Sequence, residues 1–194
     1  MGEILDAEAF VFTGGSSRRM GTDKAHLRID GETLANRTAR LLSELGMKVT
    51  AVGSPIDGYA HIADLEPGSG PLAALAAIKP ERSVAFLISC DLPQFNSAVA
   101  RFLVERLTTS VDACLPVLGE KPQFLCGAYW AGSLRTASEL SATGERRMTA
   151  FADRLKLDLV HEVELVSAGI HLDWVRQANT PEEFAALTEP EAPR

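Results

Sequence analysis

Apolar runs alternate with segments of helical periodicity from residue 9 to residue 130, and this alternation most constrains the fold. Strands are expected at residues 9–13, 48–53, 61–65, 83–89, 111–117 and 124–130, and helices at residues 33–45, from residue 71 onward, and at residues 97–107. The run from Val84 to Ile88 is wholly apolar, as in a central strand covered on both faces. Repeated strand and helix units are typical of a mostly parallel sheet between helical layers, so the sequence predicts an α/β fold.

The C-terminal part of the chain has a mixed pattern. Helices are expected at residues 134–140, 147–155 and 181–187, a strand at residues 157–165, and a frayed tail at residues 189–194. The 194 residues suffice for one substantial core, and we find no internal repeat, linker or low-complexity tract. We therefore expect a single domain over residues 1–194.

Composition and charge argue against several classes of protein. The net charge of −7 disfavours nucleic acid as a partner, because such binding needs a basic face. No apolar run approaches the roughly 20 residues that span a bilayer, and the acidic first residues do not resemble a signal peptide, so we expect no membrane contact and a cytoplasmic location. Cys90, Cys114 and Cys126 form neither a disulfide framework nor a zinc pattern, and are expected to be buried thiols.

A glycine-rich segment with basic residues follows the first expected strand. Gly14 and Gly15 allow backbone N–H groups to approach an anion closely, and Arg18, Arg19 and Lys24 supply positive charge. This arrangement predicts a phosphate-binding loop for a nucleoside triphosphate. The alternative is a polar loop with a glycine turn.

The spacing of this segment excludes two familiar phosphate-binding motifs. A Walker A loop ends in Gly-Lys-Ser/Thr, whereas Lys24 lies between Asp23 and Ala25. A dinucleotide-binding fingerprint needs three closely spaced glycines. Here the glycine after Gly15 is Gly21, six positions away, which is too far for that fingerprint.

Two aspartates lie near the ends of other expected strands. In open α/β sheets ligands bind beyond the carboxyl ends of the strands, so the loops after residues 9–13, 61–65 and 83–89 are expected to converge. Asp91 follows the central strand, where a carboxylate suits Mg²⁺, and Asp64 is expected to accept a hydrogen bond from the nucleoside. The alternatives are a helix N-cap for Asp91 and a cap in the turn before Pro71 for Asp64.

Motifs along the whole chain resemble those of the molybdenum cofactor guanylyltransferases, a family that joins GMP to molybdopterin. The motifs that carry the resemblance are Thr13-Gly14-Gly15, Arg18-Arg19-Met20-Gly21, Asp23-Lys24, Asp64, Gly70-Pro71-Leu72-Ala73, Cys90-Asp91-Leu92-Pro93, Gly144-Glu145-Arg146-Arg147 and Asn179-Thr180-Pro181-Glu182-Glu183. No single motif is decisive, whereas their combination is specific. The resemblance implies a single-domain, three-layer αβα fold with a Rossmann-like, mostly parallel sheet of the nucleotidyltransferase type.

The resemblance also implies roles for individual residues. The nucleotide-binding residues would be Phe12, Thr13, Gly14, Gly15, Lys24, Asp64, Gly70 and Asp91. The catalytic residues would be Arg18, Lys24 and Asp91, with Asp91 as the metal ligand. Arg146, Arg147 and Asn179 would lie where the pterin substrate docks, although adjacent arginines are also a common solvated surface feature.

The reaction implied by the resemblance is attack by the terminal phosphate of molybdopterin on the α-phosphorus of GTP, with release of pyrophosphate. Mg²⁺, with Mn²⁺ as an alternative, would serve as the metal, and GTP and molybdopterin would be the small-molecule substrates. No protein nucleophile or general base is needed, because the attacking phosphate is already ionised near neutral pH. Transient contacts with proteins that deliver molybdopterin, or with molybdoenzymes, are also implied.

The chain departs from the family pattern at two places. Thr13 stands where the family usually has alanine, and Val52-Gly53-Ser54 stands where it usually has an asparagine after the second strand. Three alternatives therefore stay open. They are a cytidylyltransferase for the same cofactor, a nucleotidyltransferase for a related phosphate, and a catalytically silent nucleotide-binding module.

Overall fold

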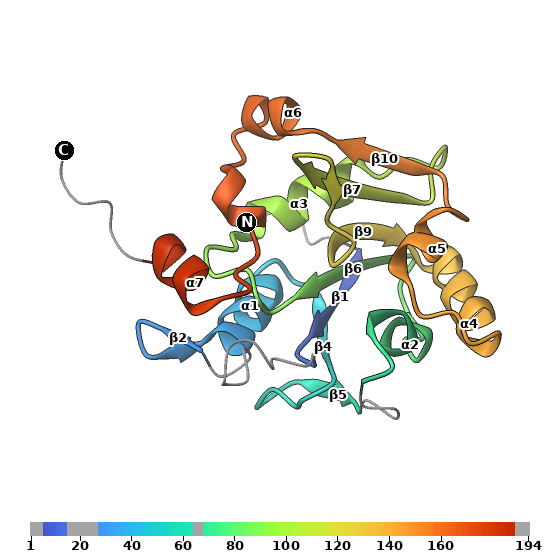
Figure 1. Cartoon of the computed structure of the whole chain (residues 1–194), viewed down its shortest axis with the longest axis horizontal. Coiled ribbons are helices and arrows are strands. Elements are labelled where there is room, and N and C mark those ends of the chain that lie inside the picture. The colour runs from blue at the N-terminus through green and yellow to red at the C-terminus, as the bar shows by residue number, and fades with distance from the viewer. Residues whose placement is uncertain (1–5, 15–26, 64–67, 189–194) are drawn as a thin grey trace.

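The structure is a computed structural model that describes residues 6–14, 27–63 and 68–188 (Figure 1). Within these residues the main sheet has eight strands, in the order β10-β7-β9-β6-β1-β4-β5, with β8 paired to β7. The strands of this sheet are β1 (Ala7–Phe12), β4 (Lys48–Val52), β5 (Ala60–Ile62), β6 (Val84–Ser89), β7 (Ala113–Leu118), β8 (Lys121–Pro122), β9 (Cys126–Trp130) and β10 (Leu157–Val160). A separate hairpin pairs β2 (Arg28–Ile29) with β3 (Glu32–Thr33).

The sheet is mostly parallel, as expected. Strand β1 pairs in parallel with β4 and β6, β4 with β5, and β7 with β10. Strand β9 is antiparallel to both β6 and β7. Because β1, β4, β5 and β6 run in one direction, their carboxyl ends lie at the same edge of the sheet.

Helices cover both faces of the sheet and complete an αβα arrangement. The helices are α1 (Leu34–Ser43), α2 (Pro71–Ala76), α3 (Ser97–Arg106), η2 (Ala131–Leu134), α4 (Arg135–Ala142), α5 (Met148–Ala152), α6 (Glu162–Ser167), η3 (Leu172–Val175) and α7 (Pro181–Thr188). Buried residues of α1 and α3 belong to one core, and those of α2, α4 and α5 belong to another. Figure 1 shows the two groups on opposite sides of the strands.

Alternation along the central strands explains why two cores form. In β1, Ala9 and Val11 belong to the core with α1 and α3, whereas Phe10 and Phe12 belong to the core with α2 and α4. Successive side chains of a strand point to opposite faces, so a wholly apolar run is stable only between two helical layers. Burial of all six residues of β6 confirms that it is a central strand.

Most expected elements are confirmed, with small differences at their ends, but the strand expected at residues 157–165 is wrong in its second half. Strand β10 ends at Val160 and helix α6 begins at Glu162. The main-chain N–H of His161 donates a 3.2 Å hydrogen bond to the Glu164 carboxylate, which favours a helix start at this point.

Two expectations drawn from the sequence can be compared with the described residues. Cys90, Cys114 and Cys126 are buried, as expected, and none of them forms a disulfide in the part of the chain that the structure describes. Burial raises the pKa of the Cys126 thiol to about 12. Among residues 6–14, 27–63 and 68–188, no helix has the length and apolar character needed to cross a membrane.

Candidate active site

The loops that follow β1, β4 and β6 meet at the carboxyl edge of the sheet. The main-chain N–H of Cys90, just after β6, donates a 3.1 Å hydrogen bond to the carbonyl oxygen of Phe12. The main-chain N–H of Thr13 donates a 2.9 Å hydrogen bond to the carbonyl oxygen of Val52, the last residue of β4. Segments distant in sequence are therefore held together where ligands of open α/β sheets bind.

The backbones after β1 and β4 approach each other without intervening side chains. Gly53 has a φ of +111°, and a Cβ atom placed on it would lie 2.7 Å from the main-chain nitrogen of Gly14. Such a separation is below van der Waals contact, so only glycine fits at position 53 without a shift of the backbone. The exposed Gly14 is the last described residue before residues 15–26.

Asp91 lies two residues beyond the end of β6 and is joined to its surroundings by side-chain and main-chain hydrogen bonds. The Ser89 hydroxyl donates to Oδ1 of Asp91. Asn96, rather than Asp91, provides the N-cap of α3, because its side chain accepts a 2.9 Å hydrogen bond from the N–H of Ala98. The alternative in which Asp91 caps the following helix is therefore wrong.

The segment before α7 packs against the loop that carries Asp91. The main-chain N–H of Ala178 donates a 2.9 Å hydrogen bond to the carbonyl oxygen of Asp91, and Nε2 of Gln177 donates a 3.4 Å hydrogen bond to Oγ of Ser89. Asn179, the next residue, donates its main-chain N–H to the Glu183 carboxylate. Asn179 therefore directly follows the residue that is bonded to Asp91, although 88 positions separate Asn179 from Asp91 in the sequence.

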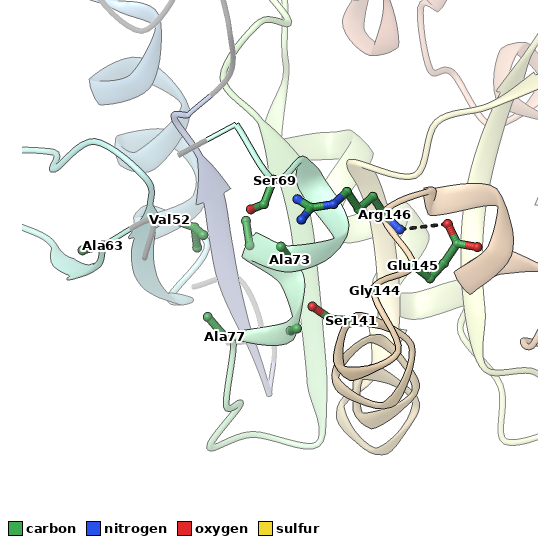
Figure 2. Close-up of a pocket in the computed structure, with 11 residues that line it drawn as sticks. Val52, Ala63, Ser69, Ala73, Ala77, Ser141, Gly144, Glu145 and Arg146 are labelled. Atoms are coloured by element: carbon green, nitrogen blue, oxygen red, sulfur yellow. Dashed lines mark hydrogen bonds between the residues drawn. The ribbon is translucent and has the colours of Figure 1, made fainter. Parts of the chain in front are cut away.

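A pocket of about 290 Å³ opens beside the ends of β4 and β5 (Figure 2). One wall is the alanine-rich surface of α2, and the opposite wall is the end of α4 with the turn that follows it. The lining residues are Val52, Ala63, Ser69, Ala73, Ala74, Ala76, Ala77, Ser141, Gly144, Glu145 and Arg146. The small side chains on α2 do not fill the pocket, and Arg146 places a positive charge at its wall.

The two arginines expected at the pterin side differ sharply in their surroundings. Figure 2 shows the Arg146 side chain extending toward Ser69, while the Glu145 carboxylate points the other way. Arg147 is 73% exposed at its side chain and forms a 2.7 Å salt bridge with Glu145. Neither an ion pair nor a side-chain hydrogen bond of Arg146 is found among the described residues. Arg146 is therefore the better candidate for binding an anionic group.

Glu145 organises this turn. Its Oε1 accepts hydrogen bonds from the main-chain N–H groups of Arg146 and Arg147, at 2.8 and 2.9 Å. The Arg147 side chain, together with these N–H groups, lowers the pKa of Glu145 to about 2. Glu145 therefore keeps its charge down to low pH, and it holds the main chain of the turn from which Arg146 extends.

The remaining site predictions have different outcomes. Gly70 immediately precedes α2 with a φ of +90°, a conformation that favours glycine. Gly15, Arg18, Lys24 and Asp64 lie outside the described residues, so their predicted roles stay predictions.

A family model described as the MobA-like NTP transferase domain matches residues 9–159. The chain belongs to this family. Two sequence relatives are probable molybdenum cofactor guanylyltransferases. The one from Synechococcus elongatus is 30% identical over 94% of this chain and 98% of its own length. The one from Pelotomaculum thermopropionicum is 28% identical over 93% of this chain and 91% of its own length.

A solved structure supports the fold of this MobA-like protein. It is the molybdopterin-guanine dinucleotide biosynthesis protein A from Archaeoglobus fulgidus, with a TM-score of 0.77 and 20% identity. The alignment covers 93% of this chain and 96% of that one. The predicted resemblance, the α/β nucleotidyltransferase fold and the assignment as a nucleotidyltransferase are confirmed.

Sequence reasoning missed several residues of this MobA-like site. Ser89 and Gln177 support Asp91, and Glu145 supports the turn that carries Arg146. Glu145 could have been found, since it stands inside the Gly144-Glu145-Arg146-Arg147 motif. Gln177 carries no such signal, because only the tertiary packing of the segment before α7 places it next to Ser89.

Proposed function

We propose that this nucleotidyltransferase transfers GMP from GTP to the terminal phosphate of molybdopterin and releases pyrophosphate. The observation that carries the proposal is the position of Asp91, held by Ser89 at the end of a buried central strand and beside the loops after β1 and β4. The names of the two sequence relatives indicate the guanine nucleotide and the molybdenum cofactor.

The donor set at Asp91 fits a divalent metal ion. Mg²⁺ is commonly bound by one or two carboxylates together with substrate phosphate oxygens, and it keeps several water molecules. Among the described residues no cluster of three metal-ligating side chains occurs. We propose that a metal at Asp91 shares its ligands with the triphosphate. Mg²⁺ bound at Asp91 would neutralise phosphate charge, and Mn²⁺ could occupy the same oxygen site.

The chain's own residues would bind and orient two anionic substrates. Backbone N–H groups around Gly14 and the side chains of Arg18 and Lys24 would hold the triphosphate, and Asp64 would accept a hydrogen bond from the nucleoside. Arg146 would hold an anionic group of molybdopterin. Fixing both substrates lowers the entropic cost of their reaction and offsets their mutual repulsion.

The test is pyrophosphate release measured with each of the four ribonucleoside triphosphates, Mg²⁺ and molybdopterin. The proposal predicts release with GTP that requires molybdopterin, together with formation of the guanine dinucleotide. Release with CTP alone would favour a cytidylyltransferase, for which the Val52-Gly53-Ser54 departure leaves room. Tight GTP binding without release would favour a catalytically silent nucleotide-binding module.

A further inference from the structure

The Thr13 side chain links the carboxyl end of β1 to the end of β4 and the loop that follows it. This side chain is buried, with only 4% of the residue exposed, at the carboxyl end of β1. The hydroxyl Oγ1 lies 2.6 Å from the carbonyl oxygen of Ser54 and 3.2 Å from that of Val52. The shorter contact is the stronger hydrogen bond, so the hydroxyl proton is directed to Ser54.

The loop after β4 is held on its other side by β5. The main-chain N–H of Gly53 donates a 2.9 Å hydrogen bond to the carbonyl oxygen of Ile62. Nε2 of His61 lies 2.6 Å from the carbonyl oxygen of Gly53. Residues 53 and 54 are thus fixed to β5 on one side and, through the Thr13 hydroxyl, to the end of β1 on the other.

The position of Gly14 depends on this arrangement. No side chain can fill the space between Gly14 and Gly53, because a Cβ on Gly53 would also lie 2.9 Å from the Cα of Gly14 and 3.2 Å from Oγ1 of Thr13. Among the described residues, two kinds of hydrogen bond join the backbone after β1 to the backbone after β4. One is the main-chain hydrogen bond from Thr13 to Val52, and the other is made by the Thr13 hydroxyl.

We infer that Thr13 is a positioning residue for nucleotide binding, which acts through the backbone of residues 12–14 and does not contact the ligand with its hydroxyl. This inference rests on the proposed function, in which that backbone contacts the nucleotide. Preorganised N–H groups bind phosphate strongly because little ordering remains to be done when the ligand arrives. Loss of the hydroxyl lets the two loops separate and weakens nucleotide binding.

The test compares Thr13→Val, which keeps the side-chain volume without the hydroxyl, with Thr13→Ser, which keeps the hydroxyl. Thr50→Val is the matched control, because Thr50 is a buried threonine of β4 outside this link. For Thr13→Val we expect the KM for GTP to rise roughly threefold to tenfold, the value of about one hydrogen bond, with kcat nearly unchanged. Thr13→Ser and Thr50→Val should keep the wild-type KM.

A second measurement reports on the loop after β4 in the protein without ligand. Amide hydrogen exchange at residues 53 and 54 should be faster in Thr13→Val than in wild type, and unchanged in Thr13→Ser. An unchanged KM in Thr13→Val, or equal impairment of the valine and serine variants, overturns the inference. A lower kcat with an unchanged KM also overturns it, because a smaller fraction of folded protein gives that pattern.

The inference and the proposed function can fail separately. If the wild-type protein binds GTP but transfers nothing, the proposed function fails, and the dissociation constants of the same variants still decide the role of Thr13. If the wild-type protein binds no nucleotide, both are wrong.

Discussion

The main-chain N–H of Ala178 donates a 2.9 Å hydrogen bond to the carbonyl oxygen of Asp91. This bond joins the segment before α7 to the loop at the end of β6, and the Gln177 side chain adds a second contact through Ser89. A residue predicted to bind nucleotide and metal and a segment predicted to bind the pterin are therefore parts of one structural unit.

Replacing Asp91 with asparagine is expected to lower pyrophosphate release by at least ~100-fold, the scale of losing a preorganised charged group at a reacting centre. Asparagine has nearly the same shape, so the fold should persist and the melting temperature without ligand should change little. The measurement is steady-state turnover with GTP, molybdopterin and Mg²⁺. Asp57→Asn, at an exposed aspartate, is the control, and equal turnover in the two variants would contradict the metal assignment.

Arg146 and Arg147 are expected to differ when each is changed to alanine. Arg146→Ala should raise the KM for molybdopterin roughly tenfold or more, because it removes a charged hydrogen-bond donor from the pocket. Arg147→Ala should raise it by less than about threefold, since an exposed ion pair with Glu145 contributes little. Initial rates at varied molybdopterin concentration decide between them, and the reverse order would show that the pocket is misassigned.

The carboxyl group of Glu145 is expected to titrate with a pKa of about 2 in the folded protein. Because this value is depressed, the charged carboxylate stabilises the folded turn at pH above the ordinary glutamate range, and that contribution is lost as pH falls toward about 2. Arg147→Gln removes the largest cause, so the pKa should rise while the main-chain N–H groups keep it below the ordinary value. A carbon-detected NMR titration measures both, and an ordinary pKa in the wild type would refute the turn geometry.

Gly53→Ala is expected to lower the free energy of unfolding by roughly 3 kcal/mol, because strain at positive φ is joined by a clash with Gly14. Gly58→Ala is the matched control, since Gly58 has a φ of +83° but no heavy atom within 4 Å of the added Cβ. It should cost roughly 1 kcal/mol, from conformation alone. Urea denaturation measures both, and equal losses would mean that the two backbones do not lie in contact.

Local patterns were enough to predict the order of the main strands and helices. The apolar run of β6 and the proline at the start of α2 each carry their own signal, and the structure confirms both. The hairpin of β2 and β3 also had a signal that went unused, because Asp30 and Gly31 both have positive φ, as an Asp-Gly hairpin turn requires.

The end of β10 was harder to predict. Residues 157–165 alternate between apolar and polar side chains except at Val160 and His161, and so favour a strand, but capping by Glu164 favours a helix from Glu162. Val163 is 78% exposed in that helix, so the apolar pattern there does not report burial. A local capping interaction therefore decided the secondary structure against the hydrophobic pattern.

The sequence motifs of the candidate site could be predicted, whereas the residues that hold those motifs in place could not. Asp91 and Arg146 were named from the sequence because each stands in a recognisable motif. The role of the Thr13 hydroxyl was not, because its acceptors at Val52 and Ser54 lie about 40 positions away and only the sheet register brings them together. Such contacts depend on tertiary structure, which periodicity and composition do not encode locally.

A crystal structure of the protein with Mg²⁺ and a non-hydrolysable GTP analogue tests the central claim most directly. Our account predicts a metal ion bound to the Asp91 carboxylate and to phosphate oxygens, with the nucleotide against the backbone of residues 12–14. A nucleotide bound at this edge of the sheet with its metal away from Asp91, or bound elsewhere on the protein, would contradict it.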